Sequence, residues 1–341
     1  MNNAVNNKRV FLVVPHVPIG YLDIVGRRDD VRLDRLANGN PTEVAQSVLA
    51  AAHAYQTSST RDELARHYHT GTELLQHAPN LLIVSTNGAG YDTVDVKACT
   101  ERGILVVNQA GGNAESVAEH VLGMMLSLVK RVVECDRALR AGTLADRAAF
   151  TGREAHGKTI GIIGIGNVGR RVAELCRGLF HMDVLAYDPY VDVEETRRRG
   201  ARKVELDELL RSADFVSINC PLTDETRGMI GARQYALMKS TAYFITTARG
   251  FIHDEAALAA ALREKKIAGW ARCLGQGTAA ARASAVAIRQ CHRHRAYRGR
   301  HPRSPRQYGP HRRRADARCA RRQTGDADCQ FAGLAGLRHT F

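Results

Sequence analysis

An apolar run that opens onto a spaced set of glycines constrains this chain more than any other feature. Residues 158–169 read Lys-Thr-Ile-Gly-Ile-Ile-Gly-Ile-Gly-Asn-Val-Gly, which places Gly164, Gly166 and Gly169 in a Gly-x-Gly-x-x-Gly spacing. The first glycine permits a tight turn after a strand, the second lets backbone approach a pyrophosphate, and the third lets the next helix pack against the sheet. Phosphate groups then bind at the N-terminus of that helix. The pattern predicts a dinucleotide-binding βαβ unit.

The segments around the glycines supply the context that such a unit needs. Residues 159–163 are strand-like, residues 168–180 have an apolar helical face, and residues 183–187 form a second apolar run that ends at Asp188. A carboxylate there accepts hydrogen bonds from a ribose 2′-hydroxyl and repels a 2′-phosphate, so Asp188 favours NAD over NADP.

Two alternatives to this interpretation of Asp188 stay open. The carboxylate could simply cap a turn before Pro189, and Arg170 and Arg171 could instead accommodate the 2′-phosphate of NADP.

The remaining sequence continues the alternation of strands and helices. Further strands are predicted at residues 8–14, 81–85, 105–108, 215–219 and 243–246, and helices at residues 42–54, 62–76, 113–139, 206–212, 232–237 and 255–265. The apolar stripe from Val117 to Val132 predicts that the longest helix lies in the core or at a dimer contact. Such alternation predicts doubly wound parallel α/β sheets, whose ligands bind beyond the carboxyl ends of the strands.

Length and composition suit a cytoplasmic enzyme. The 341 residues allow two domains, and no apolar run approaches the roughly 18 residues of a membrane helix. The asparagine-rich start is no signal peptide. Eight cysteines without a paired framework suit reduced thiols.

The positive charge is confined to one end of the chain. The formal net charge is +14, and residues 270–341, with 16 arginines, no lysine and three aspartates, carry +13 of it. The preceding 269 residues are nearly neutral, so the charge says nothing about a partner of the α/β part.

Several motifs resemble those of the NAD-dependent D-2-hydroxyacid dehydrogenases, a family that includes phosphoglycerate, glycerate and hydroxypyruvate-reducing members. They are Asn-Gly-Ala-Gly-Tyr-Asp at 87–92, Ser-Val-Ala-Glu-His at 116–120, the glycine fingerprint with Asp188-Pro189, Cys-Pro-Leu-Thr-Asp-Glu-Thr at 220–226 and Thr-Ala-Arg-Gly at 247–250. The resemblance covers roughly residues 81–269. It implies a flavodoxin-like substrate domain begun by residues 1–110, a Rossmann domain at 111–269, NAD as cofactor, and a homodimer.

The resemblance also implies the residues of the site. Backbone amides of Asn87 and Gly88 would hold the substrate carboxylate of a small 2-hydroxy or 2-oxo acid. Arg249 would bind that carboxylate and polarise the substrate carbonyl, a role that suits its planar, permanently charged fork. The cofactor site would be lined by Gly164, Ile165, Gly166, Asn167, Val168, Gly169, Asp188, Cys220, Pro221, Thr226, Thr247 and Ala248.

The family's catalytic set of Arg, Glu and His is incomplete here. The Glu belongs to a motif like Asp-Val-x-x-x-Glu-Pro and the His to Thr-Pro-His-x-Ala, and neither motif is present. Read one base later, codons for residues 272–278 can encode Asp-Val-Trp-Gly-Lys-Glu-Pro, and codons for residues 290–299 can encode Asn-Val-Ile-Ala-Thr-Ala-His-Thr-Ala-Gly. We therefore hypothesise a frameshift just before Trp270, and expect an irregular or disordered tail at 270–341 in place of the last cofactor-domain strand and the returning substrate-domain segment.

Other interpretations of the tail fit less well. An arginine-rich segment with Tyr297 and Tyr308 could bind nucleic acid non-specifically through phosphates. The cysteines and histidines of the tail match no closed zinc-site spacing, so no metal site is predicted. His253, four residues after Arg249, is expected to be structural and not the missing acid–base. Loss of the Glu–His pair predicts impaired turnover, and the alternative is a non-catalytic NAD(H)-sensing scaffold of the corepressor type.

Overall fold

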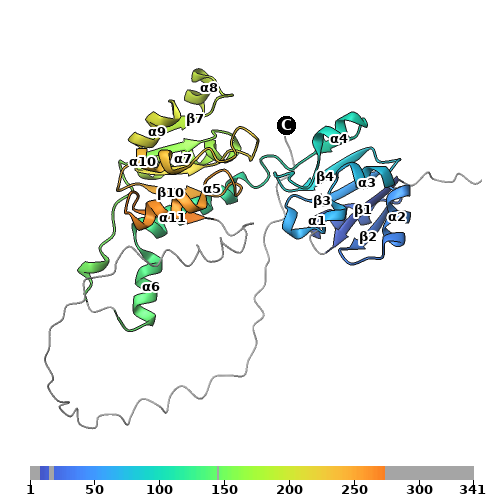
Figure 1. Ribbon diagram of the computed structural model, residues 1–341, viewed down its shortest axis with the longest axis horizontal. Coiled ribbons are helices and arrows are strands. Elements are labelled where there is room, and N and C mark those ends of the chain that lie inside the picture. Colours follow the sequence, from blue (N-terminus) through green and yellow to red (C-terminus); the bar gives the residue numbers. More distant parts are fainter. Residues whose placement is uncertain (1–7, 15–18, 144–145, 273–341) are drawn as a thin grey trace, which may run out of the picture. The chain divides into compact units, whose positions relative to one another are not determined.

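The computed structural model describes residues 8–14, 19–143 and 146–272, which form two parallel sheets flanked by helices (Figure 1). The α/β fold class predicted from the sequence is confirmed. Within these residues, no helix has the length and apolar character needed to cross a membrane.

The first sheet has five strands in the order β2-β1-β3-β4-β5, and every neighbouring pair is parallel. This is the flavodoxin-like order that the resemblance implied. Its strands are β1 (Lys8–Val14), β2 (Val31–Ala37), β3 (Ala54–Ser58), β4 (Ile83–Asn87) and β5 (Leu105–Val107), and its helices are α1 (Ile19–Gly26), α2 (Thr42–Ala51), α3 (Thr72–His77) and α4 (Val96–Glu101).

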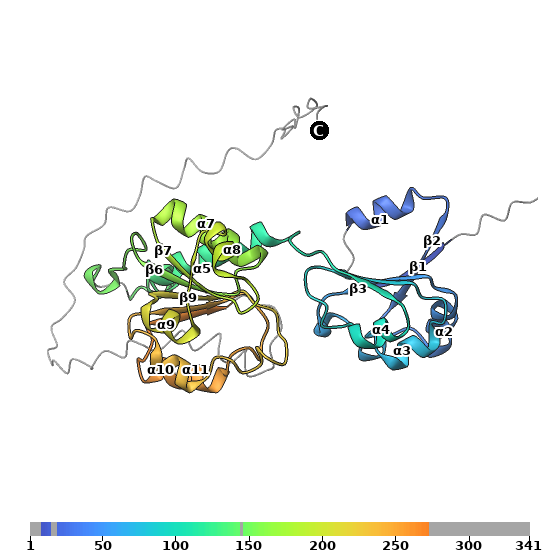
Figure 2. The same cartoon turned by 90° about the horizontal axis from the view of Figure 1, so that it is seen from above.

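The core of this sheet lies on the face covered by α2, α3 and α4, whereas α1 lies on the opposite face (Figure 2). Phe11 of β1 stacks on Tyr55 of β3 with ring centroids 4.0 Å apart, and both side chains are buried. The hydroxyl of Tyr55 donates to the carbonyl of Tyr68 at 2.9 Å, which satisfies the polar end of a buried ring.

The second sheet has six parallel strands in the order β11-β10-β9-β6-β7-β8. Numbered within the sheet, this is the Rossmann order 3-2-1-4-5-6, and its strand order reverses between β6 and β9. The strands are β6 (Thr159–Ile163), β7 (Asp183–Tyr187), β8 (Arg202–Lys203), β9 (Phe215–Ile218), β10 (Tyr243–Thr246) and β11 (Gly269–Arg272), and the helices are α5 (Ala114–Val129), α6 (Val132–Arg140), α7 (Asn167–Phe180), α8 (Val193–Arg198), α9 (Leu206–Ser212), α10 (Ala232–Leu237) and α11 (Glu255–Arg263).

Side chains alternate between the two faces of the sheet along these strands, so each strand contributes to two separate cores. Ile162 of β6 and Ile245 of β10 face the core under α5 and α7, whereas Ile163 and Phe244 face the core under α9, α10 and α11. Figure 2 shows α7 on one side of the sheet and α10 and α11 on the other. A sheet buried on both faces explains why its strands are continuous apolar runs.

Six elements have the predicted bounds, namely β1, β6, β7, β10, α9 and α10, and two predicted helices are wrong in part. Residues 62–76 form only two short 3₁₀ turns (Arg61–Glu63 and Arg66–Tyr68) before α3, whose N-cap is Gly71. The predicted helix at 113–139 is divided into α5 and α6 because Arg131 adopts a left-handed φ of 55°. The buried face of α5 centres on Ala118, Val121 and Met125, and Val132 at the end of the predicted stripe is exposed.

Strand β11 extends into the segment that the sequence analysis assigned to the irregular tail. Gly269 to Arg272 pair in parallel with Tyr243 to Thr246 as the outermost strand of the second sheet. Regular pairing thus continues three residues beyond the Gly269 boundary of the sequence analysis. The rest of the predicted tail, residues 273–341, lies outside the described residues, and the predicted domain boundaries stay a prediction.

The single tryptophan of the chain gives a direct test of β11. Trp270 is 6% exposed and belongs to the core under α10 and α11. We predict blue-shifted intrinsic fluorescence that resists iodide quenching, followed by a red shift on unfolding in urea. Emission and quenching equal to those of a free tryptophan in the native protein would contradict the pairing of β11.

Candidate functional site

A left-handed turn at Gly164 ends β6 and begins the candidate cofactor site. Gly164 has φ of 89°, and its amide donates to the carbonyl of Tyr187 at 2.9 Å. A Cβ placed on Gly164 would lie 2.8–2.9 Å from the amide nitrogen, Cα and Cβ of Cys220. Only glycine fits this conformation and this contact, so the predicted tight turn is confirmed.

The other two glycines of the fingerprint differ in what surrounds them. A Cβ on Gly169 would clash with the carbonyl oxygen of Gly164, which confirms the close packing predicted for the third glycine. Among the described residues, no atom lies within 4 Å of a Cβ placed on Gly166. Gly166 is also the N-cap of α7 and has no side chain to occupy the first amides of that helix. The surface there can hold the pyrophosphate of a dinucleotide.

Asp188 follows β7 at the same end of the sheet. Its Oδ2 accepts from the amide of Ile165 at 3.1 Å and its Oδ1 from the amide of Tyr190 at 3.0 Å. The carboxylate therefore braces the phosphate-binding turn as well as capping its own turn. Its predicted bond to a ribose stays a prediction.

Arg171 does not support the NADP alternative. Its guanidinium pairs with Glu115 at 2.6 Å and Glu174 at 2.8 Å, and these carboxylates raise its pKa. A guanidinium already paired with two carboxylates is a poor partner for a 2′-phosphate.

The 220–226 motif forms a loop after β9, on the other side of the strand-order reversal. Thr226 closes it, since its hydroxyl donates to the carbonyl of Pro221 at 2.7 Å and accepts from the amide of Thr223 at 2.8 Å. Burial raises the pKa of the Cys220 thiol to about 11. That thiol stays neutral near pH 7 and is a weak nucleophile, which leaves Cys220 a lining role.

Arg249 follows β10 and lies against the loop that follows β4. Its Nε donates to Oδ2 of Asp92 at 2.5 Å, and a Cβ on Gly90 would clash with its Nη2. Its side chain is 29% exposed. The structure thus brings the predicted substrate arginine to the 87–92 motif, which contains the predicted carboxylate-binding amides.

The remaining predicted site residues lie at or just after the carboxyl ends of β4, β6 and β10. Asn87 ends β4 and Gly88 has φ of 129°, whereas Thr247 and Ala248 follow β10 directly. Asn167 and Val168 start α7, and Ile165 is fully buried between the first two glycines. Their ligand-binding roles stay predictions.

His253 is not placed for proton transfer. Its side chain is 3% exposed, and its ring packs edge-on to Phe244 with centroids 5.6 Å apart. It precedes Asp254, the N-cap of α11. The structural role expected from the sequence agrees with this position.

Sequence reasoning missed two site residues. Asp92 belongs to the 87–92 motif, but a motif does not reveal an ion pair 157 positions away. Arg199, which donates to the Ile165 carbonyl at 2.9 Å, lies in a run of arginines that resembles a solvated surface. Within the described residues, no group of three His, Cys, Asp or Glu side chains could hold a metal ion.

Comparison with known proteins identifies this arrangement. Residues 122–272 match the family model described as D-isomer specific 2-hydroxyacid dehydrogenase, NAD binding domain. The solved structure of D-lactate dehydrogenase from Aquifex aeolicus, complexed with NAD and lactic acid, has a TM-score of 0.69 at 29% identity, covering 84% of this chain and 82% of that one. Residues 122–272 are similar to the NAD-binding domain of the D-isomer specific 2-hydroxyacid dehydrogenases.

Curated relatives of the chain are longer than the matched region. D-3-phosphoglycerate dehydrogenase of Archaeoglobus fulgidus is 43% identical over 196 residues, which are 58% of this chain and 37% of that protein. The enzyme of the same name from Mycobacterium tuberculosis strain H37Rv is 42% identical over 190 residues, or 56% and 36%. The chain therefore matches little more than a third of the length of these relatives.

Two glycine substitutions separate folding from cofactor binding in the second sheet. Gly166→Ala meets no atom of the described residues, so we predict unchanged stability but loss of NADH binding, because the methyl group occupies the pyrophosphate surface. Gly164→Ala must adopt φ of 89° against Cys220 and should lower the free energy of unfolding by about 1–3 kcal/mol. Urea denaturation and calorimetric NADH titration measure the two effects. A Gly166→Ala variant that binds NADH like the wild type would contradict the assignment.

Proposed function

We propose that this chain is an NAD-dependent oxidoreductase of the D-2-hydroxyacid dehydrogenase type, acting on a small 2-hydroxy or 2-oxo acid. The observation that carries the proposal is the contact between Arg249 and the 87–92 loop. This contact brings the permanently charged guanidinium of Arg249 next to a backbone loop that can bind a carboxylate. The glycine turn at Gly164 and the open surface at Gly166 supply the cofactor half of the same site.

The residues of the chain would divide the work as follows. Amides at the start of α7 hold the pyrophosphate, and Asp188 orients the adenosine ribose. Arg249 orients the acid and draws electron density toward its C2 oxygen, with Asp92 fixing the direction of the guanidinium. A nicotinamide held at these residues would supply hydride exchange with C2 of the acid.

Proton transfer to or from the C2 oxygen has no assigned residue in this sequence. Residues 270–341 contain no glutamate, and the family's Glu and His motifs are absent. Loss of general acid–base catalysis alone typically costs about 10²–10⁴ in rate. We therefore propose that the chain binds its ligands but turns over slowly or not at all.

Removal of the guanidinium tests the substrate half of the proposal. Arg249→Met should leave NADH affinity unchanged, since Arg249 contacts the 87–92 loop and not the glycine turn. Oxalate, a stable analogue of a 2-oxo acid, should bind the NADH complex roughly tenfold to a hundredfold more weakly, because a charge-assisted hydrogen bond is lost. Calorimetry with each ligand makes the measurement.

Asp92→Asn serves as the control for that experiment. It keeps the guanidinium but weakens its anchor, so oxalate affinity should fall less than in Arg249→Met. Equal oxalate affinity in the wild type and Arg249→Met would contradict the substrate role.

A frame-restored protein tests the catalytic half. Replacing residues from 272 onward with the sequence read one base later, which supplies Asp-Val-x-x-x-Glu-Pro and a His-containing motif, should restore NADH oxidation with glyoxylate or hydroxypyruvate. The gain should be at least about 10²-fold, since both a positioned acid–base and its orienting carboxylate return. Robust turnover by the unmodified chain would contradict the proposed impairment.

A non-catalytic NAD(H)-sensing scaffold is the second candidate, and the absence of the Glu and His motifs favours it. Partners captured from a lysate only in the presence of NADH would support it, whereas steady-state turnover would exclude it.

A homodimer and a cytoplasmic location stay predictions. Val132, Val133 and Leu139 of α6 are exposed apolar side chains that a second copy would cover.

A further inference from the structure

Ile165 is held through both of its backbone polar groups. It lies between Gly164 and Gly166, so its two peptide bonds form the turn that leads into α7. Its amide donates to Asp188 at 3.1 Å, and its carbonyl accepts from Nη1 of Arg199 at 2.9 Å. Asp188 and Arg199 therefore fix the two successive peptide planes of the phosphate-binding turn.

The carbonyl contact determines how the turn faces the cofactor. In a planar trans peptide the carbonyl and the following N–H point in opposite directions. When Arg199 holds the Ile165 carbonyl, it also directs the Gly166 amide away from itself and sets the start of α7. A rotation of this peptide would misalign the amides that face a pyrophosphate.

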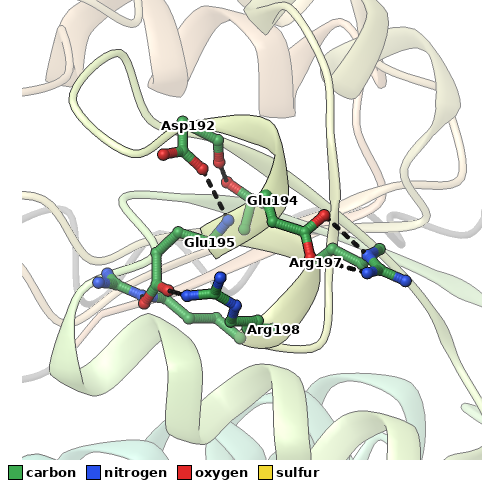
Figure 3. Close-up of polar contacts among 7 residues, drawn as sticks. Asp192, Glu194, Glu195, Arg197 and Arg198 are labelled. Atoms are coloured by element: carbon green, nitrogen blue, oxygen red, sulfur yellow. Dashed lines mark hydrogen bonds and ion pairs between the residues drawn. The ribbon is translucent and has the colours of Figure 1, made fainter.

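Glu195 of α8 holds Arg199 in place. Its Oε1 accepts from Nε of Arg199 at 2.7 Å, so the guanidinium is bound at both edges. Asp192, the N-cap of α8, fixes Glu195 by accepting from its amide at 2.7 Å. Figure 3 shows Glu195 beside its N-cap residue, with carboxylate and guanidinium groups paired along α8.

Arg198 is a neighbour that provides a natural comparison. It contacts the other oxygen of Glu195 at 3.3 Å, and its side chain is 70% exposed. The Arg199 side chain is 26% exposed and reaches the glycine turn. Two adjacent arginines thus share one carboxylate, but only Arg199 continues to the backbone of the turn.

We propose that Arg199, held by Glu195, is a positioning residue for the pyrophosphate of the dinucleotide. This inference rests on the NAD-binding function proposed above. Helix α8 would then set the conformation of the phosphate-binding turn without contacting the ligand itself. Exposed arginine–glutamate pairs usually contribute little, so the effect is expected at the turn and not in overall stability.

The test measures ligand binding by the full chain and four variants. Arg199→Ala should weaken NADH roughly tenfold, as expected for one lost charge-assisted hydrogen bond. Arg199→Lys keeps a cationic donor and should recover part of the loss, and Glu195→Gln should weaken NADH about threefold because the guanidinium loses its anchor. Arg198→Ala, the matched control, should bind like the wild type.

Two smaller ligands distinguish positioning from a general structural effect. ADP-ribose contains the pyrophosphate and should show the same loss in Arg199→Ala as NADH. Adenosine lacks it and should bind all variants equally, as measured by ligand-observed NMR.

The outcomes separate the two proposals. NADH binding to the wild type with equal losses in Arg199→Ala and Arg198→Ala, or equal losses for adenosine and ADP-ribose, would overturn the role of Arg199. If Arg199→Ala does not fold, an unchanged NADH affinity in Glu195→Gln would overturn it. No NADH binding to the folded wild type would instead overturn the proposed function.

Discussion

The contact between the Gly164 turn and the backbone of Cys220 is the constraint on which the cofactor half depends. It lies where the strand order reverses, between the carboxyl ends of β6 and β9. The loops that follow the two parallel strands at such a reversal run in opposite directions, and ligands bind in the space between these loops. A glycine with φ of 89° lets these two loops come into contact at the turn that leads into α7. Gly169, packed on the Gly164 carbonyl, fixes the helix to the same turn.

Much of this architecture is readable from the sequence because its signals are local. The apolar runs of β6, β7 and β10 are buried on both faces, so hydrophobicity alone marks them. Gly164, Gly166 and Gly169 are recognised by spacing that backbone geometry imposes. The break between α5 and α6 was not predicted because Arg131, a residue with good helical propensity, takes a left-handed conformation that its type does not indicate.

Contacts across long sequence separations could not be predicted in the same way. The Arg249–Asp92 pair and the Arg199–Ile165 bond depend on tertiary packing, and Arg199 is one of three consecutive arginines that the local sequence does not distinguish. The strand character of residues 270–272 was also not predicted. Trp270 and Ala271 still fit a strand beside β10, and both β11 and the family match end at Arg272.

The most direct test of the account is hydrogen exchange of the native chain with and without saturating NADH. The account predicts that the peptide covering residues 163–170 gains protection, together with the loop after β9 that contains Cys220, because the pyrophosphate covers the first amides of α7. NADH binding that leaves both segments unchanged and protects other parts of the chain would contradict the central claim.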